Sequence, residues 1–277
     1  MKTIVATTDF SSISLNAVNY AAAMACSIKA DLCLLHVCLF PMTYSEMPYP
    51  AESITSLMDD AEERMLQLKN ELVQRTVGKI KINTEVKTAS TVVTEIEDYC
   101  DDKKPYAVVM GTQGSTALER IFLGSNTIGA MKHLPWPLII VPPEAKFIGI
   151  KKIGLACDLK KVDDSIPVKE IRLLTKEFNA KLHVLHINTE NEKGYTVETM
   201  IESRSLQNML DDLHPVYHDL KDDDVENGLI KFAEDNQLDL LIVIPKKHNI
   251  VNQLFHKSHS KKLVLHAHVP VMAVHEN

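Results

Sequence analysis

The sequence predicts an α/β fold made of two tandem, doubly wound domains, each with a five-stranded parallel sheet. Three observations carry this prediction: short, nearly all-apolar segments of strand length, apolar residues at helical spacing between them, and a second copy of the pattern about 150 residues further on. Strands that are apolar throughout are covered on both faces of a sheet, and their alternation with amphipathic helices implies parallel pairing through right-handed crossovers. We expect the two domains to span residues 1–145 and 150–277.

The first half contains strand segments at residues 3–7, 30–37, 106–110 and 137–141. Ser11 and Ser12 are suited to cap the helix after the first of them. Three helices are predicted from apolar residues three or four positions apart. These residues are Leu15, Val18, Ala22 and Ala25, then Ala61, Met65, Leu68 and Leu72, then Val92, Ile96 and Tyr99. Each half should follow the order β-α-β-α-β-α-β-α-β.

The second half repeats these elements in the same order. Residues 2–9 recur as 152–158, 30–37 as 180–187, 106–110 as 238–243, and 137–141 as 269–274. Its helices are expected at Val168, Ile171, Leu174 and Phe178 and at Val225, Leu229 and Phe232. The run Asp222–Asp224 is expected to form a solvated loop that caps the second of these helices. The two halves should be joined near residues 143–150.

Composition narrows the class of protein. With 277 residues, 45% of them apolar, the chain is long enough for two domains with cores of their own. A net charge of −7 offers no basic surface for phosphate backbones, so we expect no nucleic acid as a partner. No apolar run approaches the roughly 20 residues of a membrane span, and Met1-Lys2 leads straight into a strand segment. We therefore expect a cytoplasmic protein without a membrane partner.

The cysteines are scattered along the chain and form no C-x-x-C pair. They are Cys26, Cys33, Cys38, Cys100 and Cys157, and all lie in apolar segments. A buried cysteine usually behaves as a small hydrophobic residue, so we interpret them as reduced core thiols rather than as redox or metal-binding residues.

Spaced glycines after the strand at 106–110 are the strongest sign of function. Gly111 and Gly114 follow that strand, and nine residues separate Gly114 from the group Gly124-Ser125-Asn126. Glycine lets backbone N–H groups close around an anion, and the unpaired amides at the start of a helix favour negative charge. Neither the lysine of a Walker loop nor the G-x-G-x-x-G pattern of dinucleotide folds is present. The spacing therefore indicates a nucleotide site of another type.

Asp9 supports the same interpretation from a second strand. In doubly wound sheets, ligands bind beyond the carboxyl ends of the strands, where the strand order reverses. Asp9 follows the first strand and Gly111 follows another, so both are expected at one edge of the sheet. The alternative is that Asp9 caps the first helix, and the two roles are compatible.

Together, these motifs resemble those of the universal stress protein family. The chain is similar to a tandem member of that family, with two domains of the adenine-nucleotide alpha-hydrolase-like fold in one polypeptide. The resemblance covers nearly the whole chain and rests on Gly111-x-x-Gly114-x9-Gly124-Ser125 and on Thr7-Thr-Asp9-Phe-Ser.

The resemblance implies that the first domain binds ATP. Asp9 would lie near the nucleoside, and the backbone of Val37 near adenine. Mg²⁺ would accompany ATP through its phosphates, with Asp9 as the nearest candidate carboxylate. The residues implied around the ribose and phosphates are Gly111, Gly114, Gly124, Ser125 and Asn126.

The resemblance also implies binding more than turnover, since family members act as stress-response sensors or scaffolds, with weak ATP hydrolysis in some. The residues agree, because the sequence has no G-x-S-x-G elbow and no general base placed beside Ser125. The family further implies that the last strands of the two domains, at 138–141 and 271–274, pair into an intramolecular pseudo-dimer. A protein partner is unidentified, and a further homodimer is left open.

The second half departs from the glycine pattern. Ile244, Lys247 and Lys257 stand where the first half has its three motif glycines. Side chains at these positions should occupy the phosphate path or forbid the required backbone, so we expect that the second domain does not bind ATP. Its lysines form either a site for a different anion or a solvated basic surface. They are Lys246, Lys247, Lys257, Lys261 and Lys262.

Histidines concentrate in the second half, and they leave two interpretations open. On the expected elements, His256 and His259 share a helical face, His266 and His268 share a strand face, and His183 and His186 point to opposite faces of one strand. These residues form either a zinc site or a scattered set of surface and core histidines. The alternative function is therefore a nucleotide-independent scaffold whose second domain binds a protein partner, a metal or another ligand.

Segment 39–60 is the largest insertion relative to the second half. It follows the second strand and so borders the expected nucleotide edge. We interpret it as either a lid over that edge or a mobile loop.

Overall fold

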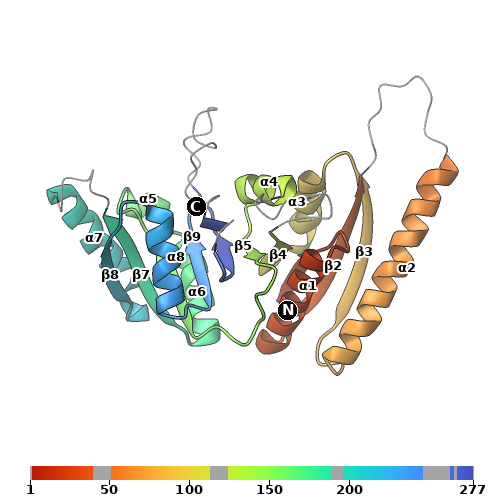
Figure 1. Ribbon diagram of the computed structural model, residues 1–277, viewed down its shortest axis with the longest axis horizontal. Helices are drawn as coiled ribbons and strands as arrows, with labels where there is room; N and C mark the ends of the chain where they lie inside the picture. Colours follow the sequence, from red (N-terminus) through yellow and green to blue (C-terminus); the bar gives the residue numbers. More distant parts are fainter. Residues whose placement is uncertain are drawn as a thin grey trace, which may run out of the picture.

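The computed structural model of the chain describes residues 2–39, 51–112, 124–188, 196–245, 263–264 and 267–276 (Figure 1). Strands form one sheet along the length of the molecule, and helices lie against it. None of the helices in these ranges combines the length and the apolar character needed to cross a membrane.

The described strands form a ten-stranded sheet in the order β3-β2-β1-β4-β5-β10-β9-β6-β7-β8. Pairing is parallel within each half, and β5 and β10 join the halves in antiparallel fashion, with Ile139 opposite Met272. The predicted fold and the predicted pairing of the last strands are thus confirmed. The strands are β1 (Thr3–Thr7), β2 (Asp31–Leu39), β3 (Ile82–Ala89), β4 (Ala107–Gly111), β5 (Leu138–Val141), β6 (Lys152–Ala156), β7 (Lys181–Asn188), β8 (Val216–Lys221), β9 (Leu240–Val243) and β10 (Val271–Ala273).

The helices follow the predicted apolar spacing, with two additions. They are α1 (Ser12–Ile28), α2 (Ala51–Arg75), α3 (Val92–Lys103), α4 (Ser125–His133), α5 (Val162–Ser165), α6 (Val168–Phe178), α7 (Val197–Leu210) and α8 (Val225–Asp235), with a 3-10 turn at Asp211–Leu213. The first addition is that residues 51–60, expected as part of a lid or loop, already belong to α2. The second is the short helix α5, which precedes a break at Ile166 and Pro167.

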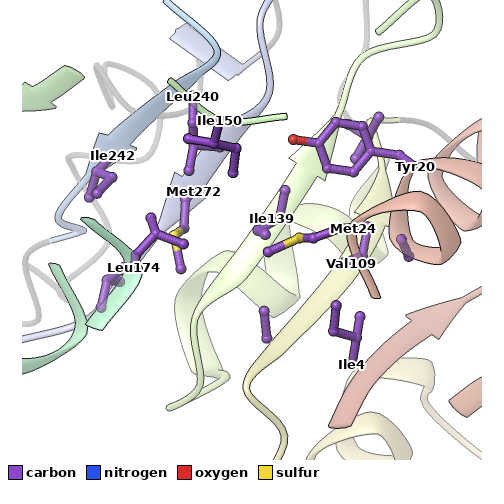
Figure 2. Close-up of a cluster of buried hydrophobic side chains, with 14 of the residues drawn as sticks. Ile4, Tyr20, Met24, Val109, Ile139, Ile150, Leu174, Leu240, Ile242 and Met272 are labelled. Atoms are coloured by element: carbon purple, nitrogen blue, oxygen red, sulfur yellow. The ribbon is translucent and has the colours of Figure 1, made fainter. Parts of the chain in front are cut away.

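Two apolar layers cover the faces of the sheet, because neighbouring residues of a strand point to opposite sides. Helices α1, α2, α6 and α7 pack on the face that carries Ile4, and α3, α4 and α8 pack on the face that carries Val5. Figure 2 shows the first layer passing from Ile4 and Met24 through Ile139 to Met272 and Leu174. Since this layer is continuous from one half to the other, the halves share a core as well as a sheet.

The strand register corrects the alignment of the two halves by one residue. Asp31 pairs with Thr3, and its counterpart Lys181 pairs with Lys152. Thr3, and not Lys2, therefore corresponds to Lys152. The second half therefore has one more residue between its first two strands than the first half has. The helix between these strands is interrupted at Pro167, since proline cannot continue a helix from within.

The connection between β5 and β6 is held against α1. The Asn16 side-chain amide donates to the carbonyls of Pro142 and Ala145, at 3.0 Å each. Phe147 lies between Tyr20 of α1, with ring centroids 5.3 Å apart, and Phe178 of α6, at 6.0 Å. Helix α1 thus contacts the connection between the halves through Asn16 and Tyr20.

Candidate functional site

The turn after β1 places Asp9 at the carboxyl edge of the sheet. The Asp9 carboxylate accepts a hydrogen bond from the Ser11 amide at 3.0 Å. Ser11 caps α1, as predicted, because its hydroxyl accepts from the Ser14 amide at 3.2 Å. The alternative that Asp9 caps the helix is therefore wrong: Asp9 stabilises the turn that precedes the cap.

Buried hydroxyl groups hold the same turn from below. Thr8 Oγ1 lies 3.0 Å from Ser14 Oγ and accepts from the Phe10 amide at 3.0 Å. The Asp9 amide donates to Ser14 Oγ at 3.3 Å. Phe10 has a left-handed backbone, with φ of 64°, which costs a residue other than glycine about 1–2 kcal/mol. The conformation of Asp9 is thus imposed by its neighbours.

Val37 lies on the part of β2 that extends past the end of β1. Near the end of β1, the backbone hydrogen bonds between these strands include that from the Thr8 amide to the Leu35 carbonyl, at 3.0 Å. Backbone groups two residues apart in a strand point the same way, so the N–H and C=O of Val37 point to the space beyond the end of β1. The Val37 side chain packs in the core on the other face from Ile4. This geometry fits a role for the Val37 backbone in binding a ligand.

The glycine-containing segments of the first half meet at the end of β4. The Gly124 amide donates to the Thr112 carbonyl at 2.9 Å, and Thr127 Oγ1 donates to the Gly111 carbonyl at 3.0 Å. These bonds dock the start of α4 on the strand. Ser125 and Asn126, in the first turn of α4, are exposed. That turn contains no acidic residue, so the helix dipole is available to an anion.

The two described motif glycines differ in whether their surroundings exclude a side chain. A Cβ on Gly111 would lie 2.9 Å from Ile13 Cγ2 and 3.1 Å from the Ile13 carbonyl oxygen, so glycine lets α1 approach β4 closely. Gly124 has φ of −57° and ψ of 141°, which any residue can adopt. The expectation that a side chain there would forbid the backbone is therefore wrong for position 124, and only occupation of the phosphate path remains.

The structure brings Asp9, Val37, Gly111 and Gly124 to one edge of the sheet, together with Ser125 and Asn126. Gly114 lies outside the described residues. Within the described part of the chain, no group of three or more histidine, cysteine, aspartate or glutamate side chains is arranged to hold a metal ion.

The corresponding turn in the second half keeps two features of the first: a left-handed residue and a histidine that contacts a backbone carbonyl. Leu159 is left-handed, with φ of 52°, and His186 Nδ1 lies 3.1 Å from the Cys157 carbonyl. In the first half, His36 Nδ1 lies 2.7 Å from the Thr8 carbonyl. The turn and its histidine are therefore common to both halves and are not specific to the candidate site.

In the second half, side chains of α7 bond to the start of α5. The Glu202 carboxylate of α7 accepts from the Val162 amide at the start of α5, at 2.8 Å, and Ser205 bonds to Asp163. The strand register shows that Ile244 occupies the position in the second half that Gly111 occupies in the first, as predicted. Lys247 and Lys257 lie outside the described residues, as do Lys246, Lys261 and Lys262.

The described histidines of the second half do not gather into one cluster. His183 and His186 point to opposite faces of β7, as predicted: His183 Nδ1 lies 2.9 Å from His218 Nε2, whereas His186 bonds to the Cys157 carbonyl. Burial lowers the pKa of His183 and of His218. His268 lies 3.7 Å from Glu234. His256, His259 and His266 are outside the described residues.

The cysteines are free thiols, and Cys33, Cys100 and Cys157 are buried. Burial raises the pKa of Cys100 to about 12, and it also raises the pKa of the partly buried Cys26 and Cys38. A raised pKa disfavours the reactive thiolate, which agrees with the predicted role as core thiols.

Two side chains near these edges carry no sequence signal. Arg64 stacks on Phe10 at the candidate site, and Glu202 accepts a hydrogen bond from the start of α5 in the second half. Both come from the helix after the second strand of their half. Each reaches a turn far away in sequence, so a pattern of local spacing does not reveal the contact.

The chain matches the model of the universal stress protein family twice, over residues 1–142 and 149–275. It is 30% identical to universal stress protein MJ0531 of Methanocaldococcus jannaschii over 146 residues, 52% of this chain and 84% of that protein. A universal stress protein structure from Archaeoglobus fulgidus covers 99% of this chain and 96% of its own, with 16% identity and a TM-score of 0.73. PA1789 of Pseudomonas aeruginosa, described as functionally unknown, covers 100% and 93%, with 11% identity and a TM-score of 0.61. The last two comparisons concern the fold alone. The chain belongs to the universal stress protein family.

Proposed function

We propose that the first half binds ATP at the carboxyl edge of its sheet and that the second half does not. The observation that carries this proposal is the difference between the two edges. The first has glycine at 111 and 124 and an exposed first turn of α4, whereas the second has Ile244 and the Glu202–Val162 hydrogen bond. The first edge suits an anionic ligand, whereas at the second edge an isoleucine stands in place of a glycine and the first amide of α5 is already bonded to a carboxylate.

In this proposal each element has one role. Asp9 lies beside the nucleoside, and the backbone of Val37, which points past the end of β1, contacts adenine. The amides of Ser125 and Asn126 receive phosphate oxygens at the positive end of the α4 dipole. Gly111 and Gly124 keep side chains out of the phosphate path, together with Gly114. Mg²⁺ accompanies ATP through its phosphates.

We further propose that the protein is a cytoplasmic stress-response sensor or scaffold with at most weak ATP hydrolysis. The first turn of α4 has no acidic side chain to activate water beside Ser125. Binding without turnover makes the nucleotide a ligand that favours one state of the protein. The second half then serves as a structural partner that completes the shared sheet.

Calorimetric titration of nucleotide-stripped protein with Mg-ATP tests this proposal. We expect one site per chain, accompanied by a rise in Tm, since a ligand at about 100 times its dissociation constant stabilises the folded state by about 2.7 kcal/mol. Two sites would show that the second half also binds. No binding at millimolar ATP would favour the nucleotide-independent scaffold.

A further inference from the structure

We propose that Arg64 of α2 is a positioning residue of the candidate site, which acts through Phe10 on the turn that carries Asp9. The proposal rests on the proposed function for the identity of the ligand, a nucleotide. The contact itself is a feature of the folded chain.

Three side chains form a stack on the α1 and α2 side of the sheet. The Arg64 guanidinium lies 4.0 Å from the centre of the Phe10 ring. On β2, His36 has its ring centre 4.6 Å from that of Phe10, tilted by 41°. His36 Nδ1 in turn lies 2.7 Å from the Thr8 carbonyl. The stack therefore connects α2 and β2 to the residues on both sides of Asp9.

Phe10 is the point at which this stack acts on the turn. Its left-handed backbone is unfavourable for a side chain of its size and persists only when surrounding groups hold it. The next amide, that of Ser11, donates to the Asp9 carboxylate. When Phe10 leaves its position, the Ser11 amide moves with it, and its hydrogen bond to the Asp9 carboxylate is weakened.

The second half shows that the fold itself does not need the stack. At the turn position equivalent to Phe10, the second half has Leu159, which is also left-handed but is only 4% exposed and is held by packing. The histidine and its bond to a backbone carbonyl are retained there. What the first half adds is an aromatic ring at the left-handed position and an exposed arginine above it. The addition occurs only at the edge with the glycines, which indicates a role in the site.

The strength of the contact suits a turn that adjusts to a ligand. An exposed cation–π contact changes an equilibrium by about two- to fivefold, much less than full burial of a large side chain. The turn of the first half is therefore held in the binding conformation without being fixed in it. Nucleotide affinity should depend on how often this conformation is populated.

A double-mutant cycle in the full-length protein tests the proposal. The variants are Arg64→Ala, Phe10→Leu, which copies the second half, and the combination of both. Arg64→Lys keeps the charge, and Arg75→Ala is the control, since Arg75 lies exposed on the same helix and bonds to Asn19. Two quantities are measured: hydrogen exchange of the Ser11 amide in nucleotide-free protein, and the Kd for Mg-ATP.

We expect Arg64→Ala and Phe10→Leu each to accelerate Ser11 exchange and to raise Kd by about two- to fivefold. The double variant should add nothing further, because both changes break one contact. Arg64→Lys should restore part of the effect, and Arg75→Ala should change neither quantity.

The proposal is overturned if exchange is unchanged in Arg64→Ala, if Arg75→Ala has the same effect, or if the two substitutions act independently. It is also overturned if exchange accelerates while Kd for ATP stays the same. Absence of ATP binding by the wild-type protein contradicts the proposed function instead, and the exchange measurements then still decide whether Arg64 holds the turn.

Discussion

The two halves place corresponding residues at the carboxyl edges of their sheets, and these residues differ in size. Gly111 of the first half corresponds to Ile244, and half-buried Phe10 corresponds to buried Leu159. The backbone of the turn and its bonded histidine are retained in both. The difference teaches that one fold carries different side chains at its two edges, and this is the basis of the proposed asymmetry in ligand binding.

The helices that follow the first strand of each half also differ. Helix α1 is continuous and begins at Ser12, after the cap Ser11, whereas its counterpart is divided at Pro167 into α5 and α6. The short α5 packs against α7, which supplies Glu202 to its first amide. At this edge of the second half, therefore, a carboxylate from another helix accepts from the first amide of α5, whereas in the first half Ser11 caps α1 locally.

The largest expected effect comes from copying the second half into the first. Gly124→Lys should weaken ATP binding by about a hundredfold or more, because it removes phosphate contacts that contribute about 1.5–3 kcal/mol each. The backbone of Gly124 accepts any residue, so the fold should remain intact. Calorimetry gives the affinity, and circular dichroism checks the fold. Unchanged affinity would contradict the phosphate role of this segment.

Gly111→Ala should lower the free energy of unfolding by about 1–3 kcal/mol, the usual cost of forcing an added methyl group into a packed contact. The added Cβ would meet Ile13, including its backbone carbonyl, which cannot move as a side chain can. Urea unfolding measures the change. Gly124→Ala is the matched control and should be close to neutral, because its backbone is unstrained. Equal stability of both variants would mean that α1 shifts to accommodate the methyl group.

The fold could be predicted because each strand is a short apolar run and each core helix has a regular apolar face. Residues 51–60 were not predicted as helix, since the described part of that segment is mostly exposed and lacks such a face. The break at Pro167 was missed for a different reason. The spacing of Val168 to Phe178 indicates a helix but does not reveal the one extra residue before it.

The candidate site could be predicted in part because its residues follow strand ends. Asp9, Val37 and Gly111 lie at the carboxyl edge for this reason alone. Arg64 and Glu202 could not be predicted, since their contacts depend on where α2 and α7 lie over the sheet. Such placement follows from packing across the whole half and leaves no local pattern.

A pair of stacked histidines, one buried and one half-buried, should make the second half sensitive to acid. His183, 7% exposed, and His218 stack with ring centres 5.1 Å apart, and Phe232 lies 4.6 Å from His218. Burial lowers the pKa of both; the charge of Lys181 lowers both further, and His218 and Lys152 act on His183 as well. Near and below pH 6.5 the unfolded chain therefore binds more protons than the folded chain. The contribution of the neutral histidine pair to the free energy of unfolding is fully present above pH about 6.5 and is lost as the pH falls below it.

Thermal unfolding between pH 5 and 8 measures this effect. We expect His218→Phe to reduce the fall in Tm on the acid side. The control is His133→Gln, at an exposed position of the first half, which should leave the fall unchanged. Imidazole pKa values at or above 6.5 for both histidines, measured by NMR, would contradict the prediction.

The smallest expected effect concerns the hydrogen bond from the Val162 amide to the Glu202 carboxylate. Glu202→Ala should cost about 0.5–2 kcal/mol of stability, as loss of a helix cap does, because the Val162 amide loses its partner at the start of α5. Glu198→Ala is the matched control, since Glu198 is an exposed carboxylate on the same helix. Neither variant should gain ATP binding, because Ile244 still occupies the position of Gly111. A second ATP site in Glu202→Ala would show that this one carboxylate, and not the lost glycines, keeps nucleotide out of the second half.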